Sequence, residues 1–142
     1  MSRSAGRVLL VDDMHDDARL LAQLLAPLDA NVLVARSAAE AIGILDNETV
    51  DLVVTDLNMP DVSGLDLARE VRGRLDVPAV IFMTGSQRPT DRAAAFELGA
   101  VAYLQKPIDV AHLIGLAREI LRERAEARMT DAANDNHPPS VH

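Results

Sequence analysis

The chain has 142 residues, 49% of them hydrophobic, and its 22 acidic and 14 basic side chains give a formal charge of −8. That length suits one globular domain, and the absence of cysteine excludes a zinc ribbon, a thiol nucleophile and a disulfide framework. The negative charge argues against nucleic-acid binding, which usually needs a basic face. No apolar run approaches the ~20 residues of a membrane helix, and the segment before Asp12 is too short for a signal peptide. We therefore expect a cytoplasmic protein with no membrane contact and no direct nucleic-acid partner.

Five short apolar runs recur along the chain, with room for a helix between each pair. They are Val8–Val11, Val32–Ala35, Leu52–Thr55, Ala79–Met83 and Val101–Leu104. The runs are continuous rather than alternating, which is typical of parallel strands that helices cover on both faces. The sequence therefore predicts a doubly wound α/β sandwich of (βα)5 type, in which ligands bind beyond the carboxyl ends of the strands.

Amphipathic segments with helix-start signals lie between these runs. The start signals are Ser37 with Glu40, Ser63 with Asp66, and Asp109 before the last helix. We expect the last helix to fray in the charged stretch 122–128, and the polar segment 129–142 has little to bury. The predicted organisation is a short N-terminal extension over 1–6, one domain over 7–125, and a disordered tail over 126–142.

Charged and hydroxyl side chains follow four of the five predicted strands. Asp12 and Asp13 follow the first, Asp56 the third, Thr84 the fourth and Lys106 the fifth. Each is commonplace alone, as a helix cap, a strand end or a loop residue. Lys106 is the only lysine, because the other thirteen basic residues are arginine. Together, in this order along one sheet edge, they indicate a single site.

The sequence resembles the receiver domain of bacterial two-component response regulators over roughly residues 6–125. The motifs that carry this resemblance are VLLVDD over 8–13, DLVVTDLNMP over 51–60 with Gly64, MTG over 83–85, and GAVAYLQKP over 99–107. The resemblance implies a flavodoxin-like fold with a parallel five-stranded sheet in the order 2-1-3-4-5. That order is taken from the family.

The resemblance also implies a magnesium site. Three carboxylates a few Å apart repel by about 4 kcal/mol per close pair at an effective dielectric of about 20, and a hard divalent cation relieves that repulsion. By resemblance, Asp12, Asp13, Asp56 and the backbone carbonyl of Asn58 would hold Mg²⁺, for which Mn²⁺ is a substitute.

Asp56 would be the phosphoacceptor of this site. Lys106 would neutralise the phosphoryl group, Thr84 would donate its hydroxyl, and the backbone at Leu57 and Gly85 would bind phosphoryl oxygens. Thr84 and Tyr103 would form the switch. The implied partners are a histidine kinase or histidine phosphotransfer protein, and a downstream protein on the face formed by 89–98, 101–105 and the last helix.

The sequence leaves alternatives open. No output domain is recognisable after residue 125, so we expect a stand-alone regulator that acts by binding a protein or by onward phosphotransfer. It would assist its own phosphorylation and dephosphorylation without being an enzyme in the usual sense. The alternatives are a phosphorylation-independent scaffold of the same fold and a small haloacid-dehalogenase-type phosphohydrolase, in which the acid pair follows the lysine.

Overall fold

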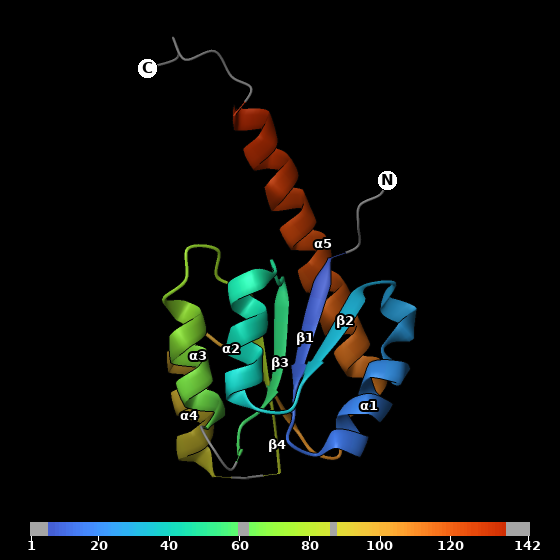
Figure 1. Cartoon of the computed structure of the whole chain (residues 1–142), viewed down its shortest axis with the longest axis vertical. Helices are drawn as coiled ribbons and strands as arrows, with labels where there is room; N and C mark the ends of the chain where they lie inside the picture. The colour runs from blue at the N-terminus through green and yellow to red at the C-terminus, as the bar shows by residue number, and fades with distance from the viewer. Residues whose placement is uncertain (1–5, 60–62, 86–87, 136–142) are drawn as a thin grey trace.

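The computed structural model describes residues 6–59, 63–85 and 88–135, in which strands and helices alternate (Figure 1). The strands are β1 (Arg7–Val11), β2 (Asn31–Ala35), β3 (Leu52–Asp56), β4 (Ala79–Thr84) and β5 (Ala102–Gln105). The helices are α1 (His15–Leu24), a 3₁₀ turn η1 (Ala26–Leu28), α2 (Ala38–Asn47), α3 (Gly64–Arg72), α4 (Pro89–Glu97) and α5 (Val110–Asp135). All five predicted strands are confirmed.

The strands form one sheet in the order β2-β1-β3-β4-β5, and every neighbouring pair is parallel. In the register, Val8 lies beside Val32 on one side and Leu52 on the other. Because all strands run the same way, their carboxyl ends lie at one edge. The predicted flavodoxin-like α/β fold is thereby confirmed.

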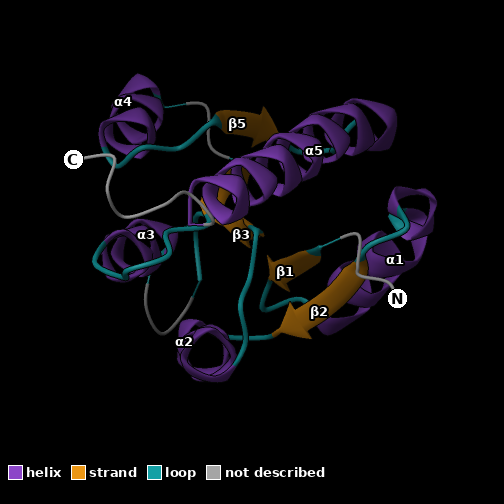
Figure 2. Ribbon diagram, turned by 90° about the horizontal axis from the view of Figure 1, so that it is seen from above, coloured by secondary structure: helices purple, strands orange, loops and turns teal. Residues whose placement is uncertain are grey.

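Helices cover both faces of the sheet (Figure 2). Successive strand residues point to opposite faces, so Leu9 and Val11 pack with α2 and α3, while Val8 and Leu10 pack with α1 and α5. Burying each such side chain contributes about 1.5–3 kcal/mol. These two apolar layers hold β1, β3 and β4 rigidly, and so fix the residues that follow them.

The last helix is longer than the sequence predicted. The structure gives a continuous helix to Asp135, where the sequence predicted fraying over 122–128 and disorder from 126, and the division into domain and tail stays a prediction. Residues 136–142 lie outside the described residues. Figure 1 shows α5 running along the sheet and projecting beyond the edge at which the strands begin.

Ion pairs explain this extension. The face of α5 that packs on the sheet is apolar at Leu113, Ala117 and Leu121, and the same face continues as Arg124 and Arg128. These two arginines pair with the buried Asp51, directly before β3, and with the exposed Asp76. Asp51 also accepts a hydrogen bond of 2.8 Å from the backbone N–H of Arg7. We call Asp51, Asp76, Arg124 and Arg128 the Asp51 cluster.

Across the described stretches 6–59, 63–85 and 88–135, no helix has both the length and the apolar content needed to span a bilayer.

Candidate functional site

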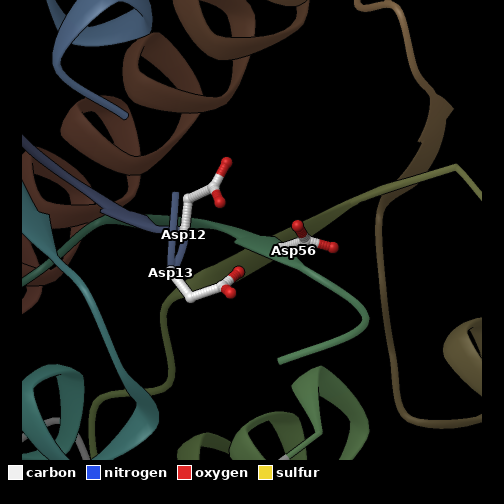
Figure 3. A group of neighbouring side chains, drawn as sticks. All are labelled: Asp12, Asp13 and Asp56. Carbon is white, nitrogen blue, oxygen red and sulfur yellow. The ribbon is translucent and has the colours of Figure 1, made fainter. Parts of the chain in front are cut away.

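Three carboxylates meet at the carboxyl edge of the sheet (Figure 3). Asp12 and Asp13 follow β1, and Asp56 ends β3. Val11 lies beside Thr55 in the β1–β3 register, so the residues after them are also neighbours. One oxygen from each of the three carboxylates lies within 4.8 Å of the others, as the strand order predicted.

Lys106 is the cation of this site. Its Nζ lies 2.8 Å from Oδ2 of Asp56 and 3.7 Å from Oδ2 of Asp12. The lysine is held in place by its own main chain, because its N–H donates to the carbonyl of Thr84 at 2.7 Å. The Lys106 side chain thus reaches from the end of β5, past the end of β4, to the carboxylates.

The charges of the site perturb one another. Burial raises the pKa of Asp12 above its ordinary 3.8; the N–H of Met14 and the charge of Lys106 oppose this, and the charges of Asp56 and Asp13 add to it. Burial lowers the pKa of Lys106, but the hydrogen bond and charge of Asp56 and the charge of Asp12 outweigh it, so the pKa is raised above 10.5. The lysine is therefore protonated at neutral pH, and burial disfavours the negative charge of Asp12.

Two backbone N–H groups orient the carboxylates. Met14 donates to Oδ1 of Asp12 at 2.9 Å, and Asn58 donates to Oδ1 of Asp56 at 3.1 Å. Both are Asx turns, in which an aspartate accepts a hydrogen bond from the N–H two residues later. From the sequence we expected only the backbone carbonyl of Asn58 to take part in the site, and this N–H was not predicted. The spacing of an Asx turn was the signal that could have found it.

The predicted role of the Leu57 backbone needs correction. The N–H of Leu57 donates to the carbonyl of Met83 at 2.9 Å, because the β3–β4 ladder continues one residue past Asp56. The Leu57 N–H is therefore already hydrogen-bonded within the sheet. The N–H of Asn58 lies instead at the carboxylate, so it replaces Leu57 as the candidate phosphoryl ligand on this side.

Thr84 and Gly85 border the site at the end of β4. Thr84 is fully buried, and its Oγ1 lies 3.5 Å from Nδ2 of Asn58. A Cβ added at Gly85 would meet nothing within 4 Å, so the space in front of this backbone is open. The next residues, 86 and 87, lie outside the described residues. The site can therefore admit a small group between Thr84, Lys106 and the carboxylates.

Tyr103 is a residue of β5 and lies beside Phe82 of β4 in the register. Its ring is half-buried against the layer under α2, α3 and α4, with the Phe96 ring of α4 centred 6.5 Å away. Its hydroxyl is buried and has no hydrogen-bond partner among the described residues. Tyr103 thus lies on β5 with its ring near the Phe96 ring of α4, and its part in a switch stays a prediction.

The donor set fits a hard divalent cation. Three carboxylates converge, each offering oxygen, and Mg²⁺ is commonly held by one or two carboxylates together with waters and a phosphate. Among the residues that the structure describes, none adds a nitrogen or sulfur ligand to this cluster, which favours Mg²⁺ or Mn²⁺ over zinc.

An apolar groove adjoins the site. It has a volume of about 290 Å³ and runs from Asp12 and Lys106 along α1, where Leu20, Leu21 and Leu24 line it. Leu20 and Leu24 are 56% and 44% exposed, respectively. Pro107 and Ile108 form the opposite wall. An exposed apolar surface therefore lies next to Asp56.

Comparison with known proteins agrees with this geometry. Residues 8–118 match the response regulator receiver domain, and the chain belongs to this family. The transcriptional regulatory protein CpxR of Klebsiella pneumoniae is 40% identical over 116 residues, which cover 82% of this chain and 49% of that protein. CpxR of Escherichia coli K12 is 36% identical over 135 residues, covering 95% of this chain and 57% of that protein.

Solved structures show the same fold. A CheY-like receiver domain protein from Methanospirillum hungatei superposes with a TM-score of 0.80 and 26% identity, covering 86% of this chain and 98% of that one. The family membership makes this chain a receiver of the two-component type and excludes the haloacid-dehalogenase alternative. The chain spans about half the length of the two CpxR proteins, and the stand-alone arrangement stays a prediction.

Proposed function

We propose that this receiver accepts a phosphoryl group on Asp56 from the phosphohistidine of a histidine kinase or histidine phosphotransfer protein. The observation that carries the proposal is the placement of the Asp56 carboxylate 2.8 Å from Lys106 and within 4.8 Å of the Asp12 and Asp13 carboxylates. Asp56 accepts a hydrogen bond of 2.8 Å from the Lys106 ammonium, whereas Asp12 lies 3.7 Å from that ammonium.

In the transfer step an Asp56 carboxylate oxygen attacks phosphorus. The new O–P bond forms as the P–N bond to the donor histidine breaks, and the electron pair of that bond returns to the imidazole nitrogen. The rate of such a step depends mainly on positioning and on neutralising the phosphoryl oxygens. Asn58 N–H holds the attacking carboxylate, and the Lys106 ammonium is placed to neutralise the product acyl phosphate.

Asp12, Asp13, Asp56 and the backbone carbonyl of Asn58 would hold Mg²⁺. When bound, the ion supplies positive charge that offsets both the carboxylates and the phosphoryl oxygens. Thr84 would donate its hydroxyl to one phosphoryl oxygen, and the Asn58 and Gly85 N–H groups would bind others. The open space at Gly85 and the burial of Thr84 support these assignments.

The phosphorylated state would act through the surface of α4, β5 and α5. A Thr84 hydroxyl drawn toward the phosphoryl group would leave room behind it for the Tyr103 ring, which lies on β5 near the Phe96 ring of α4. Phosphorylation would then shift an existing equilibrium between two arrangements of this face. The output is either binding of a downstream protein there or onward phosphotransfer, in the cytoplasm. The apolar groove along α1 is suited to the donor protein, since it is lined by Asp12 and by Lys106, which contacts Asp56.

Phosphorylation by a small donor tests this proposal directly. Incubation with Mg²⁺ and acetyl phosphate should add one phosphoryl group that is labile to base and hydroxylamine, measured by intact mass. Asp56→Asn and removal of Mg²⁺ by a chelator should each abolish the addition. Asp109→Asn, which removes a carboxylate outside the site and keeps the cap that Asp109 provides to α5, is the control. Full labelling of Asp56→Asn would contradict the assignment.

A further inference from the structure

Gly64, the first residue of α3, lies directly against the main chain of the phosphoacceptor. A Cβ added there would lie 2.5 Å from the carbonyl oxygen of Asp56 and 2.9 Å from the Cα of Leu57. Carbon atoms in proteins do not approach backbone atoms this closely. The contact is not a matter of backbone conformation, because only Gly6 and Gly99 among the described glycines have positive φ. A side chain is excluded at Gly64 because the main chain of Asp56 and Leu57 lies too close.

The surroundings of Gly64 cannot move aside easily. The third neighbour of the added Cβ, at 3.1 Å, is a ring carbon of the fully buried Phe82. The start of α3 is fixed by the Ser63 hydroxyl, which accepts a hydrogen bond of 3.2 Å from the N–H of Asp66. Further along, α3 is held in the core by Leu67, Ala68 and Val71. Close-packed interiors relax only partly around an added atom.

The neighbour of Gly64 that belongs to the site is Asp56, whose carbonyl also accepts a hydrogen bond of 3.0 Å from the Thr55 hydroxyl. It ends β3, and the chain after it leaves the sheet within two residues. Gly64 also touches this turn through its own N–H, which donates to the carbonyl of Leu57 at 2.7 Å. A methyl group at Gly64 would thus press on the carbonyl of Asp56 and displace the carboxylate relative to Lys106, Asp12 and Asp13.

We propose that Gly64 is a positioning residue for phosphoryl transfer. Its lack of a side chain allows α3 to start against the Asp56 carbonyl and so sets where the Asp56 carboxylate stands. This inference rests on the proposed function of Asp56. A displacement of reacting groups by about 1 Å can slow a positioned reaction by as much as a hundredfold. We expect Gly64→Ala to slow phosphorylation about tenfold to a hundredfold, and to weaken Mg²⁺ binding as well.

The test uses the full chain in a stabilised background. Gly43→Ala in α2 and Gly115→Ala in α5 place methyl groups where nothing lies within 4 Å, and alanine favours helix over glycine. Gly64→Ala is added to this double variant, and Val71→Ala is added separately as a matched control. Val71 is a buried residue of the same helix, about two turns after Gly64, so its truncation destabilises α3 without crowding the site.

Three quantities are measured on each protein: the urea unfolding curve, the Mg²⁺ affinity, and the rate of phosphorylation at saturating acetyl phosphate. The proposal predicts that Gly64→Ala lowers the rate and the Mg²⁺ affinity, whereas Val71→Ala lowers only stability. Equal rates in the two variants would overturn it, as would a Gly64→Ala protein that does not fold even in the stabilised background. If the double variant itself takes up no phosphoryl group, the proposed function of Asp56 fails instead.

Discussion

Arg128 of α5 forms an ion pair with Asp51, so the last helix is fastened to the edge of the sheet opposite Asp56. Asp51 is 3% exposed, whereas the Arg128 side chain is 46% exposed, so the acid is the buried member of the pair. Removing both Arg124 and Arg128 would leave a buried carboxylate without its cations. We expect the double alanine variant to lose about 1–3 kcal/mol of unfolding free energy, measured by urea denaturation.

The same variant should also show faster amide hydrogen exchange over residues 122–135. This part of α5 projects beyond the body of the domain, so the lost ion pairs with Asp51 and Asp76 are contacts that hold it there. Arg122→Ala changes an exposed arginine of the same helix and serves as the control. Truncation after Arg128 keeps the Asp51 cluster and should leave the unfolding curve nearly unchanged, whereas truncation after Glu123 removes both arginines. Unchanged exchange in the double variant would show that the helix does not depend on these pairs.

Asp12→Asn should raise the free energy of unfolding at pH 7 in the absence of Mg²⁺. Burial raises the pKa of Asp12, so the folded state binds this proton more tightly than the unfolded state. The ionisation of Asp12 therefore lowers stability as pH rises from 3.8 through its folded pKa. The gain from asparagine should be present above that window and absent below pH 3.8, in urea denaturation at a series of pH values.

The matched control is Asp29→Asn. Asp29 is exposed and has a φ of 58°, a conformation that asparagine also tolerates. A similar gain from this change would mean that net charge, and not the burial of Asp12, is responsible.

Thr84→Ala should still accept a phosphoryl group, about tenfold more slowly, because it removes one hydrogen bond to a charged group. The larger effect should fall on the response. Phosphorylation of the unmodified chain should shift the amide NMR signals of α4, β5 and α5, and most of this shift should be lost in the variant. Thr84→Ser keeps the hydroxyl and should keep the response. A full response from Thr84→Ala would mean that the coupling runs by another route.

Tyr103→Phe should raise the free energy of unfolding by about 1 kcal/mol, because burying an unpartnered hydroxyl carries a cost that phenylalanine avoids. The Tyr103 hydroxyl is buried and has no hydrogen-bond partner in the described part of the chain. Tyr103→Leu, which loses the ring contact with Phe96, should instead lower stability. Destabilisation by Tyr103→Phe in thermal unfolding would indicate that the hydroxyl is hydrogen-bonded after all.

The sequence was most informative where a local pattern decides the outcome. Continuous apolar runs predicted the five strands, and the parallel order then brought Asp12, Asp13, Asp56 and Lys106 to one edge. The sequence was less informative where a local structure depends on a contact with a residue far away in the chain. Arg128, within the helical segment 122–135, pairs with Asp51, which lies 77 positions earlier in the sequence. The bond from Leu57 N–H to Met83 and the contact of Gly64 with Phe82 likewise exist only once the strands and α3 are assembled.

The projecting part of α5 gives the molecule two separate poles. At about 1.5 Å per residue, the segment after Leu121 extends for about 21 Å. It leaves from the edge where the strands begin, whereas Asp56 and the apolar groove along α1 lie at the edge where they end. A protein bound to α5 after Leu121 would therefore not contact a phosphodonor docked at Asp56.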